Sequence, residues 1–313
     1  MRVLVLGGTG FVSGAAVRRL LAEGCDVVLF HRGDSSGGAR TIRGDRRELL
    51  KLRGEFERLR PEIVLDTIAY TEKDAEDLVR TFRGLAKRTV VLSSQDVYAP
   101  YGRLLRLEAG SPNPALLSED APLRSSRHPY RAMARPGEMA YDYEKILVER
   151  AARTEPVLPA TVLRLPSVYG PGDPQRRLRT YLERMTSPEL LMDRAKAAWR
   201  WTRGYVEDVA EAIARVCLDS RATGKTYNVG EEDALSEAEW TVAIGKAAGW
   251  DGEVRRVGRE ELPEGLAEPY DFAHDLAADT RRIREDLGYC EPVGRDEGLR
   301  RTVAWEKEQP ASS

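Results

Sequence analysis

The chain has 313 residues, of which 42% are hydrophobic and 32% charged, so it can bury a sizeable core in one large domain or in two modest ones. Its formal net charge of −2 excludes the strong attraction to nucleic acids or anionic membranes that a basic protein has, and we expect neither as a partner. No apolar run reaches the length of a membrane span, and the first residues lack the pattern of a signal peptide, which predicts a cytoplasmic protein. The spacing of the three cysteines and three histidines predicts neither a disulfide framework nor a metal site.

The first half of the chain alternates short apolar segments with amphipathic ones. We expect strands at residues 3–6, 27–30, 63–66 and 89–92, a weaker strand near 41–42, and helices over 15–22, 48–59 and 75–83. Near-continuous apolar strands that alternate with helices are typical of a parallel sheet covered on both faces. With right-handed crossovers, this pattern predicts an α/β protein with a Rossmann-type doubly wound parallel sheet.

The second half is less regular. Residues 98–136 are rich in Pro, Ser, Gly and Arg and predict a long loop, of the kind that often forms a functional lid. A helix over 141–152 and a strand at 161–165 are expected next, and the elements beyond residue 171 are mixed. We therefore divide the chain into a Rossmann domain over residues 1–170 and a smaller C-terminal α/β subdomain over 171–313, some segments of which return to the Rossmann sheet.

A glycine-rich segment follows the first predicted strand directly. It reads Gly7-Gly8-Thr9-Gly10-Phe11-Val12-Ser13-Gly14, and a helix is expected next. Gly7 permits a tight turn, Gly10 lets the backbone approach a pyrophosphate, and the helix N-terminus offers free N–H groups to that anion. The alternative is a tight turn without a ligand. Because the strand–turn–helix context is the one that dinucleotide sites require, we predict that Gly7, Thr9, Gly10, Phe11 and Val12 bind a nicotinamide dinucleotide.

The residues after the second predicted strand bear on the choice of cofactor. An acidic residue about 20 positions beyond the glycines would bond the ribose 2′-hydroxyl of NAD, whereas this chain has His31 and Arg32. Arg32 can pair with the 2′-phosphate of NADP through its fork of donors, or it is simply a solvent-exposed arginine. We expect NADP or NAD, with a slight preference for NADP. Asp45 is expected to accept a hydrogen bond from the adenine amino group, the alternative being a helix cap.

Candidate catalytic residues follow further along the chain. Tyr141 and Lys145 are four residues apart in a predicted helix and would share one face. A lysine ammonium beside a phenol lowers its pKa from about 10, which makes Tyr141 a candidate general acid/base. Ser94 ends a strand where ligands gather in a doubly wound sheet and is expected to bond a substrate hydroxyl or carbonyl, unless it only caps the following loop. Asp96 is a second acid/base candidate if burial raises its pKa, its alternative role being to bond nearby backbone.

Several motifs appear in order along the chain. They are Gly7 to Gly14, Gly44-Asp45, Ser93-Ser94-Gln95-Asp96-Val97-Tyr98, Tyr141-x-x-x-Lys145, Arg164 to Gly172, Tyr227-Asn228-Val229-Gly230, and the closing patterns Asp279 to Ile283 and Leu287-Gly288-Tyr289. With these motifs, the chain resembles an extended short-chain dehydrogenase/reductase of the NAD-dependent epimerase/dehydratase family over nearly its whole length. It is similar to an atypical branch in which the first helix–strand unit ends in Arg-Gly. Some members of that branch bind RNA, a property that the net charge does not support here.

The resemblance implies roles for individual residues. Ser94, Tyr141 and Lys145 would form the catalytic triad, and Lys145 would also hold the nicotinamide ribose. The cofactor would in addition be flanked or lined by Ala69, Tyr70, Ser93, Pro166 and Val168. The C-terminal subdomain would hold the small-molecule substrate, typically a nucleotide-activated sugar, and two helices from each subunit would pair in a homodimer.

Three departures from the family pattern bear on these expectations. Ser13 stands where the family has its third glycine, and the second strand lacks its acidic residue. In the segment before residue 206, where many nucleotide-sugar enzymes have an arginine for the diphosphate, an ungapped alignment places Trp201. Arg200 or Arg203 is expected to take over as the substrate-binding arginine.

The residues leave more than one reaction open. Epimerisation through a keto intermediate needs only the triad and a tightly held cofactor, and it is our first choice. Dehydration needs a further acid/base, for which Asp96 is the candidate because Gln95 transfers no proton at neutral pH. One alternative is an NADPH-dependent carbonyl reductase acting on a non-nucleotide small molecule, which Arg32 would suit. Another is a non-catalytic cofactor-binding or RNA-associated scaffold, against which the complete triad argues.

Overall fold

The core of the fold is a seven-stranded parallel sheet. The structure is a computed structural model that describes residues 1–33, 38–113 and 115–310. The strand order is β10–β6–β5–β4–β1–β2–β3, and all neighbouring pairs run parallel. These strands are β1 (Arg2–Leu6), β2 (Asp26–His31), β3 (Arg40–Arg43), β4 (Ile63–Asp66), β5 (Arg88–Ser94), β6 (Ala160–Leu165) and β10 (Thr226–Asn228). The predicted Rossmann-type α/β fold is confirmed.

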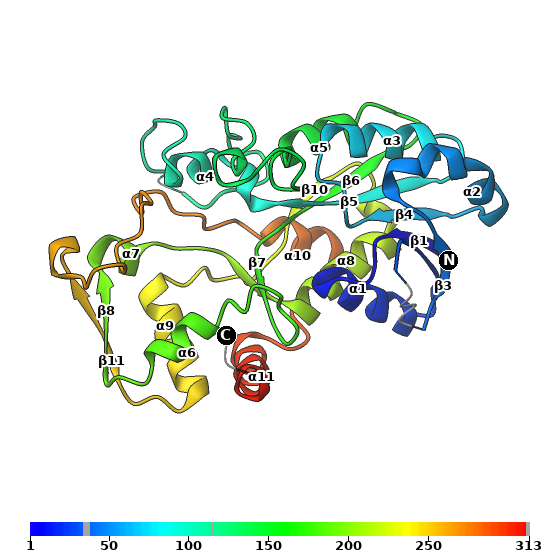
Figure 1. Ribbon diagram of the computed structural model, residues 1–313. Coiled ribbons are helices and arrows are strands. Elements are labelled where there is room, and N and C mark those ends of the chain that lie inside the picture. The colour runs from blue at the N-terminus through cyan, green and yellow to red at the C-terminus, as the bar shows by residue number, and fades with distance from the viewer. Residues whose placement is uncertain (34–37, 114, 311–313) are drawn as a thin grey trace.

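Helices cover both faces of the sheet. In Figure 1, α1 (Phe11–Ala22) and α8 (Val206–Leu218) lie below the sheet, and α2 (Arg53–Leu59), α3 (Glu72–Phe82) and α5 (Lys145–Ala152) lie above it. Because successive side chains of a strand point to opposite faces, β1 contributes to both layers. Val3 and Val5 belong to the core that includes α1 and α8, whereas Leu4 and Leu6 belong to the core on the other face. The sheet is therefore buried on both sides, as its apolar strands predict.

The sheet has its topological switch point between β1 and β4. From β1 the chain winds outward to β2 and β3, and from β4 it winds in the other direction to β5 and β6. In such sheets ligands bind outside the carboxyl ends of the strands at the switch point. The glycine-rich segment follows β1, and Ser94 ends β5, so the two predicted sites lie along the same edge.

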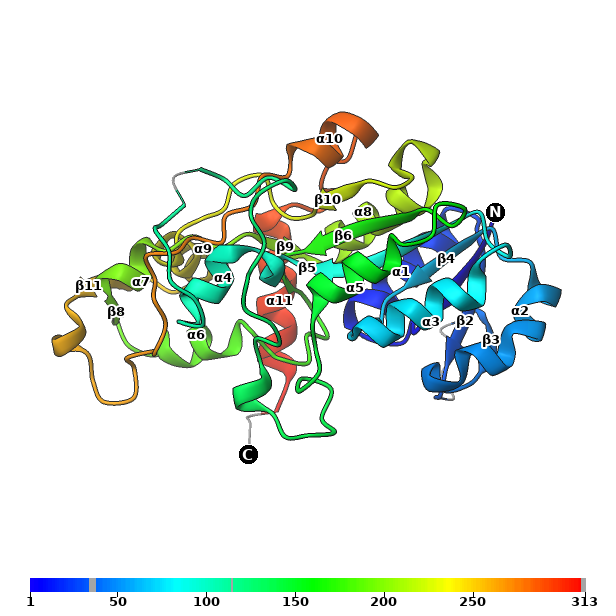
Figure 2. The ribbon, with the colours of Figure 1, turned by 90° about the horizontal axis from the view of Figure 1, so that it is seen from above.

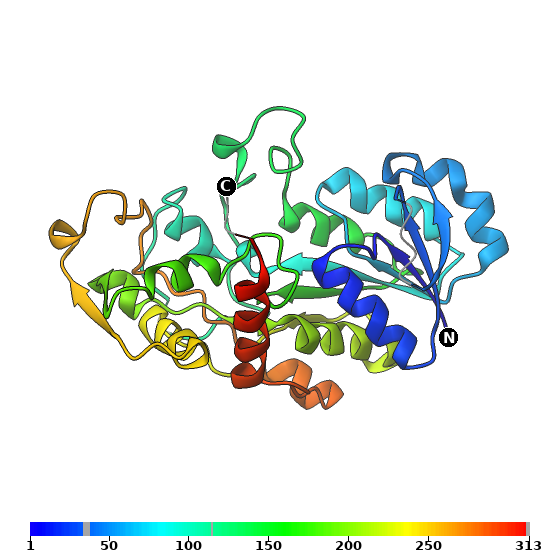
Figure 3. The same ribbon diagram turned by 60° about the horizontal axis from the view of Figure 1, so that its bottom comes forward.

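The C-terminal part adds two small parallel sheets and several helices. Strand β8 (Glu189–Asp193) pairs with β11 (Glu253–Val257), and β7 (Ser167–Tyr169) pairs with β9 (Arg203–Tyr205). The helices are α6 (Arg179–Arg184), α7 (Arg194–Ala198), α9 (Glu237–Ala248), α10 (Arg281–Leu287) and α11 (Arg295–Glu308). Figure 2 shows β8, β11 and α7 at the end of the molecule away from β1, and Figure 3 shows α11 in red across the middle. Two segments beyond residue 171 join the Rossmann part, since β10 pairs with β6 and α8 packs on α1.

Some predicted elements differ in detail. The segment 98–136 begins with a short helix, α4 (Ala99–Leu104), before it becomes irregular. The helix expected over 48–59 is a 3₁₀ turn, Arg46–Leu52, followed by α2. The helix expected over 141–152 begins only at Lys145, for a reason that lies in the site itself. None of the described helices is long and apolar enough to cross a membrane.

Candidate active site

The glycine-rich loop has the backbone that a dinucleotide requires. Gly7 and Gly8 have φ angles of +97° and +96°, which favour glycine. A Cβ atom on Gly7 would lie 2.4 Å from Thr67 Oγ1, so the loop passes too close to the end of β4 for any side chain. Gly10 is the N-cap of α1, and the first turn of this helix offers N–H groups and a positive dipole end. These features fit a pyrophosphate.

Ser13, which replaces the third glycine, takes part in this helix cap. Its side-chain Oγ accepts a hydrogen bond from the Gly10 backbone N–H at 3.0 Å. The residue is buried, and its small side chain is accommodated in the first turn of α1. The Ser13 side chain therefore provides a partner for one of the backbone N–H groups that have none within the helix. The loop keeps its conformation.

A cavity of about 480 Å³ lies beside the loop, within the usual size range of ligand pockets. Most of the residues around it follow the carboxyl ends of β1, β2, β3 and β4, while Asp74 comes from α3 and Met139 from the segment before α5. Those predicted to bind the cofactor are Gly7, Thr9, His31, Arg32, Asp45 and Tyr70. The structure thus brings residues from four strands together at the switch point.

Hydrogen-bond donors dominate the end of β2. The Gly33 backbone N–H donates to His31 Nδ1 at 3.1 Å, so in the neutral ring the proton is on Nε2. The Arg32 side chain is 76% exposed, and its Nη1 lies 3.7 Å from Asp45 Oδ2. An NAD-specific enzyme would have a carboxylate acceptor at this strand end. The described residues instead present a histidine and an arginine.

Asp45 acts as a helix cap, which was the alternative to its predicted contact with adenine. It accepts a hydrogen bond from the Arg47 backbone N–H at 2.9 Å and begins the 3₁₀ turn. The Arg47 guanidinium hydrogen-bonds to the same carboxylate and holds the pKa of Asp45 well below its usual range. Because Asp45 also borders the cavity, its contact with adenine stays a prediction.

Arg46 borders the same cavity and was missed by the sequence reasoning. Its Nη1 and Nη2 atoms lie 2.7 and 2.6 Å from the two carboxylate oxygens of Asp66, and its Nε lies 2.9 Å from Asp74 Oδ1. Asp66 is completely buried at the end of β4. Since these partners are distant in sequence, no local pattern could have indicated the cluster.

The two serines that end β5 have different surroundings. Ser94 is half-buried, and its Oγ accepts a hydrogen bond from the Asp96 backbone N–H at 3.2 Å. Ser93 Oγ donates to Glu149 Oε1 at 2.6 Å, and Glu149 also binds Arg164. The Ser93 hydroxyl is therefore engaged with the Glu149–Arg164 pair of the core, and its contact with the cofactor stays a prediction.

Helix α5 begins at Lys145, so the expectation that Tyr141 and Lys145 share a helix face is wrong. The N-cap is Glu144, whose φ of −160° and ψ of 93° are extended. Its carboxylate is fully buried with Arg124, at 3.1 Å between Oε1 and Nη2, and also accepts a hydrogen bond from the His128 backbone N–H at 2.7 Å. These tertiary contacts hold residue 144 in an extended conformation and prevent an earlier helix start.

As a result, Tyr143 and not Tyr141 lies beside Lys145. The Tyr143 ring centroid is 5.7 Å from Lys145 Nζ. The Tyr141 ring instead packs against the Arg131 guanidinium, with 4.8 Å between Cζ and the ring centroid. The catalytic role of Tyr141 stays a prediction.

Lys145 joins the ends of two strands. Its Nζ donates to the backbone carbonyl of Ala69 at 2.6 Å and to that of Leu92 at 2.9 Å. It also lies 4.8 Å from the centroid of the Tyr70 ring. Burial of the ammonium lowers the pKa of Lys145 to about 8. Ala69 and Tyr70, both predicted to flank the cofactor, are thus placed next to Lys145.

Asp96 is the centre of a cluster of phenols. Its Oδ2 accepts hydrogen bonds from Tyr143 at 2.8 Å and from Tyr130 at 2.9 Å. The Tyr130 and Tyr101 hydroxyls are 2.9 Å apart. The carboxyl group is buried, and burial raises the pKa of Asp96. Asp96 was proposed as an acid/base on the condition that burial raises its pKa, and this condition is met.

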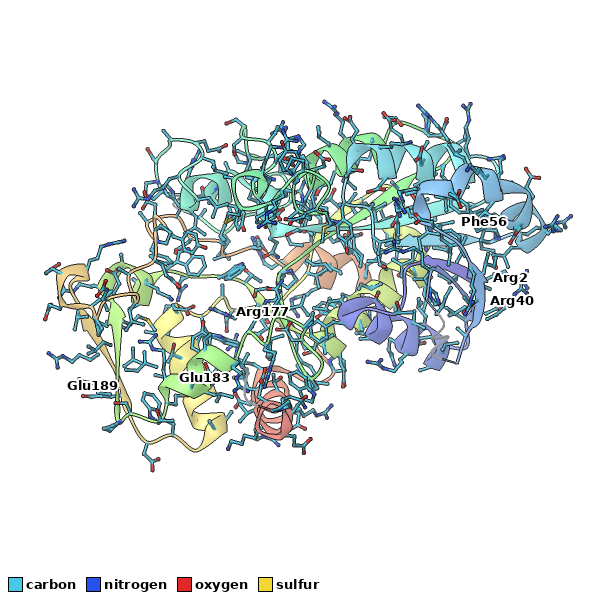
Figure 4. All side chains as sticks on the ribbon, viewed as in Figure 1. Arg2, Arg40, Phe56, Arg177, Glu183 and Glu189 are labelled. Atoms are coloured by element: carbon cyan, nitrogen blue, oxygen red, sulfur yellow. The ribbon has the colours of Figure 1, made fainter. Side chains whose placement is uncertain are left out.

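A second cavity, of about 600 Å³, lies in the C-terminal part of the chain. Basic and aromatic side chains are prominent in its lining, namely Tyr169, Arg177, Tyr181, Arg184, Lys196, Trp201, Arg203 and Trp240. Arg177, and the acidic Glu183 of α6 that also borders this cavity, are labelled in Figure 4. Ser167 of β7 borders it too and stands between Pro166 and Val168 in the sequence, the two residues predicted to line the nicotinamide.

Of the two arginines considered for the substrate, Arg203 borders this cavity. Its Nη2 donates to Glu237 Oε2 at 2.5 Å, and its guanidinium carbon lies 4.5 Å from the centroid of a Trp240 ring. Arg200 is half-exposed, pairs with Glu239 at 3.9 Å, and is not among the residues that border the cavity. Trp201, which the ungapped alignment places at the position of the family arginine, does border it.

Comparison with known proteins decides the family. The model of the NAD dependent epimerase/dehydratase family matches residues 3–230. The chain belongs to this family. It is accordingly an NAD-binding enzyme of the extended short-chain dehydrogenase/reductase type.

Curated relatives of this epimerase/dehydratase-family protein catalyse different reactions. A dTDP-glucose 4,6-dehydratase from Streptomyces niveus is 26% identical over 338 residues, which cover 99% of this chain and 94% of the relative. A UDP-glucose 4-epimerase from Mycolicibacterium smegmatis is 27% identical, with 97% of both chains covered. A 2′-dehydrokanamycin reductase from Streptomyces kanamyceticus is 28% identical over 80% of this chain and 67% of the relative.

Solved structures share the fold of this family member. The UDP-glucose 4-epimerase of Thermus thermophilus, in complex with NAD, has a TM-score of 0.68 and 23% identity, with 98% of this chain and 99% of that chain covered. MoeE5 in complex with UDP-glucose and NAD has a TM-score of 0.68 and 22% identity, with the same coverage. These likenesses show the fold alone.

The sequence of this epimerase/dehydratase-family enzyme did not indicate that three phenols gather around Asp96. Tyr143 stands within the motif, two residues before the lysine, but the expected helix would have turned it away from Lys145. Tyr101 lies in α4 and Tyr130 in the irregular stretch that follows it, and neither belongs to a motif. Only the folding of that segment onto the end of β5 brings them together.

Proposed function

We propose that the enzyme reversibly oxidises a hydroxyl-bearing carbon of a nucleotide-sugar, with epimerisation through a keto intermediate as the first choice of reaction. One observation supports this choice of substrate above all. The cavity rich in basic and aromatic side chains begins at Ser167, directly beside the segment predicted to line the nicotinamide. Arg177, Lys196 and Arg203 are each paired with a carboxylate of this chain, and a diphosphate would share these cations with Asp173, Glu268 and Glu237. Trp201 can pack against a base.

The residues at the switch point fit a dinucleotide. A Cβ atom would collide at Gly7, and the adjoining cavity has the size of a ligand pocket. When bound, NAD supplies the nicotinamide ring that accepts and returns a hydride. The loop from Gly7 to Val12 would hold the pyrophosphate, and Asp45 the adenine. Lys145 uses two of its three N–H groups on backbone carbonyls, which leaves one for a ribose hydroxyl.

The substrate hydroxyl would be bound at the end of β5. Ser94 Oγ accepts a backbone hydrogen bond, and its own O–H, which bonds to Tyr143 in this structure, would turn to the substrate oxygen. A phenol near Lys145 is required for the proton, and the motif spacing selects Tyr141 for that role. Dehydration would need Asp96 as a further acid/base.

We also propose that the adenosine end accepts a 2′-phosphate, so that NADP binds at least as well as NAD. The His31 Nε2–H and the exposed Arg32 are both donors, and they stand where a carboxylate would select NAD. A phosphate needs donors, whereas a ribose hydroxyl is served best by an acceptor. The preference for NADP therefore follows because the groups at the end of β2 are hydrogen-bond donors and not a carboxylate.

The first experiment is to denature the purified enzyme and identify the released nucleotide by mass spectrometry. Retained NAD or NADP would show a cofactor recycled within each turnover, as an epimerase or dehydratase requires. UDP-glucose and dTDP-glucose would then be offered, and the products resolved by nuclear magnetic resonance. Unchanged nucleotide-sugars with every base tested would contradict the proposal.

A carbonyl reductase is the second candidate. It is favoured by the donors at the end of β2 and by the match to 2′-dehydrokanamycin reductase, whose name gives a substrate that is not a nucleotide. A reductase consumes NADPH in each turnover, so its cofactor must exchange. A preparation that contains no nucleotide, binds added NADPH and oxidises it with a ketone would establish this second function in place of the first.

A further inference from the structure

A directed chain of hydrogen bonds ends on Asp96. A carboxylate can only accept, so the Tyr143 and Tyr130 hydroxyls, at 2.8 and 2.9 Å from Oδ2, are both donors to it. Tyr130 has then used its proton, and the Tyr101 hydroxyl at 2.9 Å must donate to Tyr130. The order of donation is therefore Tyr101 to Tyr130 to Asp96, with Tyr143 donating to Asp96 from the other side.

This order leaves the Tyr143 oxygen free to accept. Its own proton points to Asp96, so the Ser94 hydroxyl that bonds to it must be a donor, and one lone pair of Tyr143 Oη remains for a substrate hydroxyl. The ring is half-buried and lies 5.7 Å from Lys145 Nζ, and a hydrogen bond with Ser94 also acts on its hydroxyl. Tyr143 thus has the two neighbours, Ser94 and Lys145, that the motif predicts for Tyr141.

Tyr141 lies outside α5, with its ring packed against Arg131, because the buried pair of Glu144 and Arg124 holds residue 144 in an extended conformation. For Tyr141 to share a face with Lys145, residues 141–144 would have to join α5 as another turn. That turn would require the Glu144 carboxylate to leave Arg124 and the His128 N–H, all of which are buried or partly buried. The observed arrangement satisfies each of these groups.

We propose that Tyr143 is the catalytic phenol and that Asp96 takes up the phenolic proton, the two forming a relay. This inference rests on the proposed function. As the substrate carbon loses a hydride, with its two electrons, to the oxidised cofactor, its hydroxyl proton passes to Tyr143 Oη. The phenolic proton passes at the same time to Asp96 Oδ2, the carbon–oxygen bond becomes a carbonyl, and Asp96 becomes a neutral acid. Return of the hydride to either face of the carbonyl carbon reverses every proton movement.

The relay avoids a free phenolate. Burial and the Asp96 charge raise the pKa of Tyr143 well above its ordinary value, so a phenolate would be disfavoured here. Burial also raises the pKa of Asp96, which makes its carboxylate a stronger base than an exposed one. Asp96 Oδ1 has no hydrogen-bond partner within the described ranges, so the carboxyl group has capacity to take a proton. The net transfer is from the substrate to Asp96, with Tyr143 neutral before and after.

The test compares three single substitutions of tyrosine by phenylalanine. Tyr143→Phe removes the proposed phenol, and Tyr141→Phe removes the one that the motif selects. Tyr289→Phe is the matched control, because it removes a buried hydroxyl that donates to the Asp208 backbone carbonyl at 3.3 Å, remote from the site. Single-turnover reduction of bound NAD is followed by absorbance with UDP-glucose and dTDP-glucose, and NAD affinity is measured separately by calorimetry.

We expect Tyr143→Phe to slow single-turnover reduction by about 10²–10⁴-fold with NAD affinity unchanged, while Tyr141→Phe changes it less than tenfold. The Tyr289→Phe control should match the wild type. A large loss in Tyr141→Phe with a normal rate in Tyr143→Phe would overturn the relay and leave the proposed function standing. A wild type that reduces no bound NAD with either sugar would overturn the proposed function itself.

Tyr130→Phe gives a second readout that does not depend on the Tyr143 variant folding. Tyr130 is a positioning residue whose hydrogen bond stabilises the Asp96 carboxylate, so its removal should raise the pKa of Asp96 further. Hydride transfer requires Asp96 in its carboxylate form. The acid limb of the pH–rate profile, where Asp96 becomes protonated, should therefore move to higher pH in Tyr130→Phe. Infrared difference spectra of the NADH–ketone state should show a carboxylic-acid band that Asp96→Asn lacks. An unshifted pH profile together with no such band would overturn the relay.

Discussion

The buried pair of Arg124 and Glu144 is the feature that decides where α5 begins, and its strength can be measured. Arg124→Met removes the guanidinium and leaves the Glu144 carboxylate in a site where neither side chain is exposed. Loss of one partner from a buried pair costs about 3–5 kcal/mol. Arg124 Nε also donates to the Asp96 backbone carbonyl at 2.5 Å, and an unpartnered buried carbonyl adds about 1–3 kcal/mol. We expect the free energy of unfolding to fall by about 4 kcal/mol or more.

The matched control is Arg131→Met in the same segment. Arg131 Nη2 lies 3.1 Å from Asp142 Oδ1, the distance of the buried pair, but these two side chains are 44% and 62% exposed. Exposed pairs contribute about 0.2–1 kcal/mol, so this variant should stay within about 1 kcal/mol of the wild type. Both are measured by urea unfolding followed by circular dichroism, with linear extrapolation. Equal losses of stability in Arg124→Met and Arg131→Met would refute the conclusion that burial gives the Arg124–Glu144 pair its strength.

A double variant separates the buried charge from the other contacts. Arg124→Met with Glu144→Leu removes both charges, and apolar replacements of buried pairs are often tolerated. We expect it to recover part of the stability lost by Arg124→Met, although neither the part that the Asp96 carbonyl contributes nor the bonds that Glu144 accepts from the His128 and Ile146 N–H groups. A double variant no more stable than the single one would show that the uncompensated carboxylate is not the source of the loss.

Three further variants and one control, Gly24→Ala, test the two cavities. Gly7→Ala should weaken NAD binding tenfold or more, since φ is +97° and the new Cβ would lie 2.4 Å from Thr67 Oγ1. Gly24→Ala, which has φ of +75° and open space, should cost only the backbone strain of about 1–2 kcal/mol in urea unfolding. Arg32→Ala should weaken NADP binding by calorimetry and leave NAD binding unchanged, whereas equal losses would remove the argument for a 2′-phosphate. Trp201→Ala should weaken UDP binding about tenfold, or roughly 1.4 kcal/mol, with NAD affinity unaffected, and an unchanged UDP affinity would exclude the C-terminal cavity as the nucleotide site.

The parts of the site that were predictable depend on neighbours in sequence. The strand, tight turn and helix around Gly7 are adjacent along the chain, and the glycines are needed for local backbone reasons. The alternation of apolar strands with helices predicts a parallel sheet, and the winding rule then places the ends of β1 and β5 on the same edge. For this reason the fold and the family could be anticipated from residue pattern and motif order.

The start of α5 was predicted wrongly because helix periodicity is a local signal. A single buried carboxylate, held by Arg124 from 20 residues earlier, outweighs it and leaves Tyr141 outside the helix. The Arg46 cluster and the phenols around Asp96 were missed for the same reason, since their members come from separate segments.

The sequence by itself determined the doubly wound sheet, the dinucleotide loop and the position of Ser94 at a strand end, because each depends on short-range pattern and on the handedness of crossovers. Only the tertiary structure decided which tyrosine meets Lys145, which carboxylate is buried among phenols, and which arginine borders the second cavity. The first two outcomes depend on how the segment with Arg124, Tyr130 and Glu144 packs against the end of β5, where buried charges must find partners. The third depends on the position of β9.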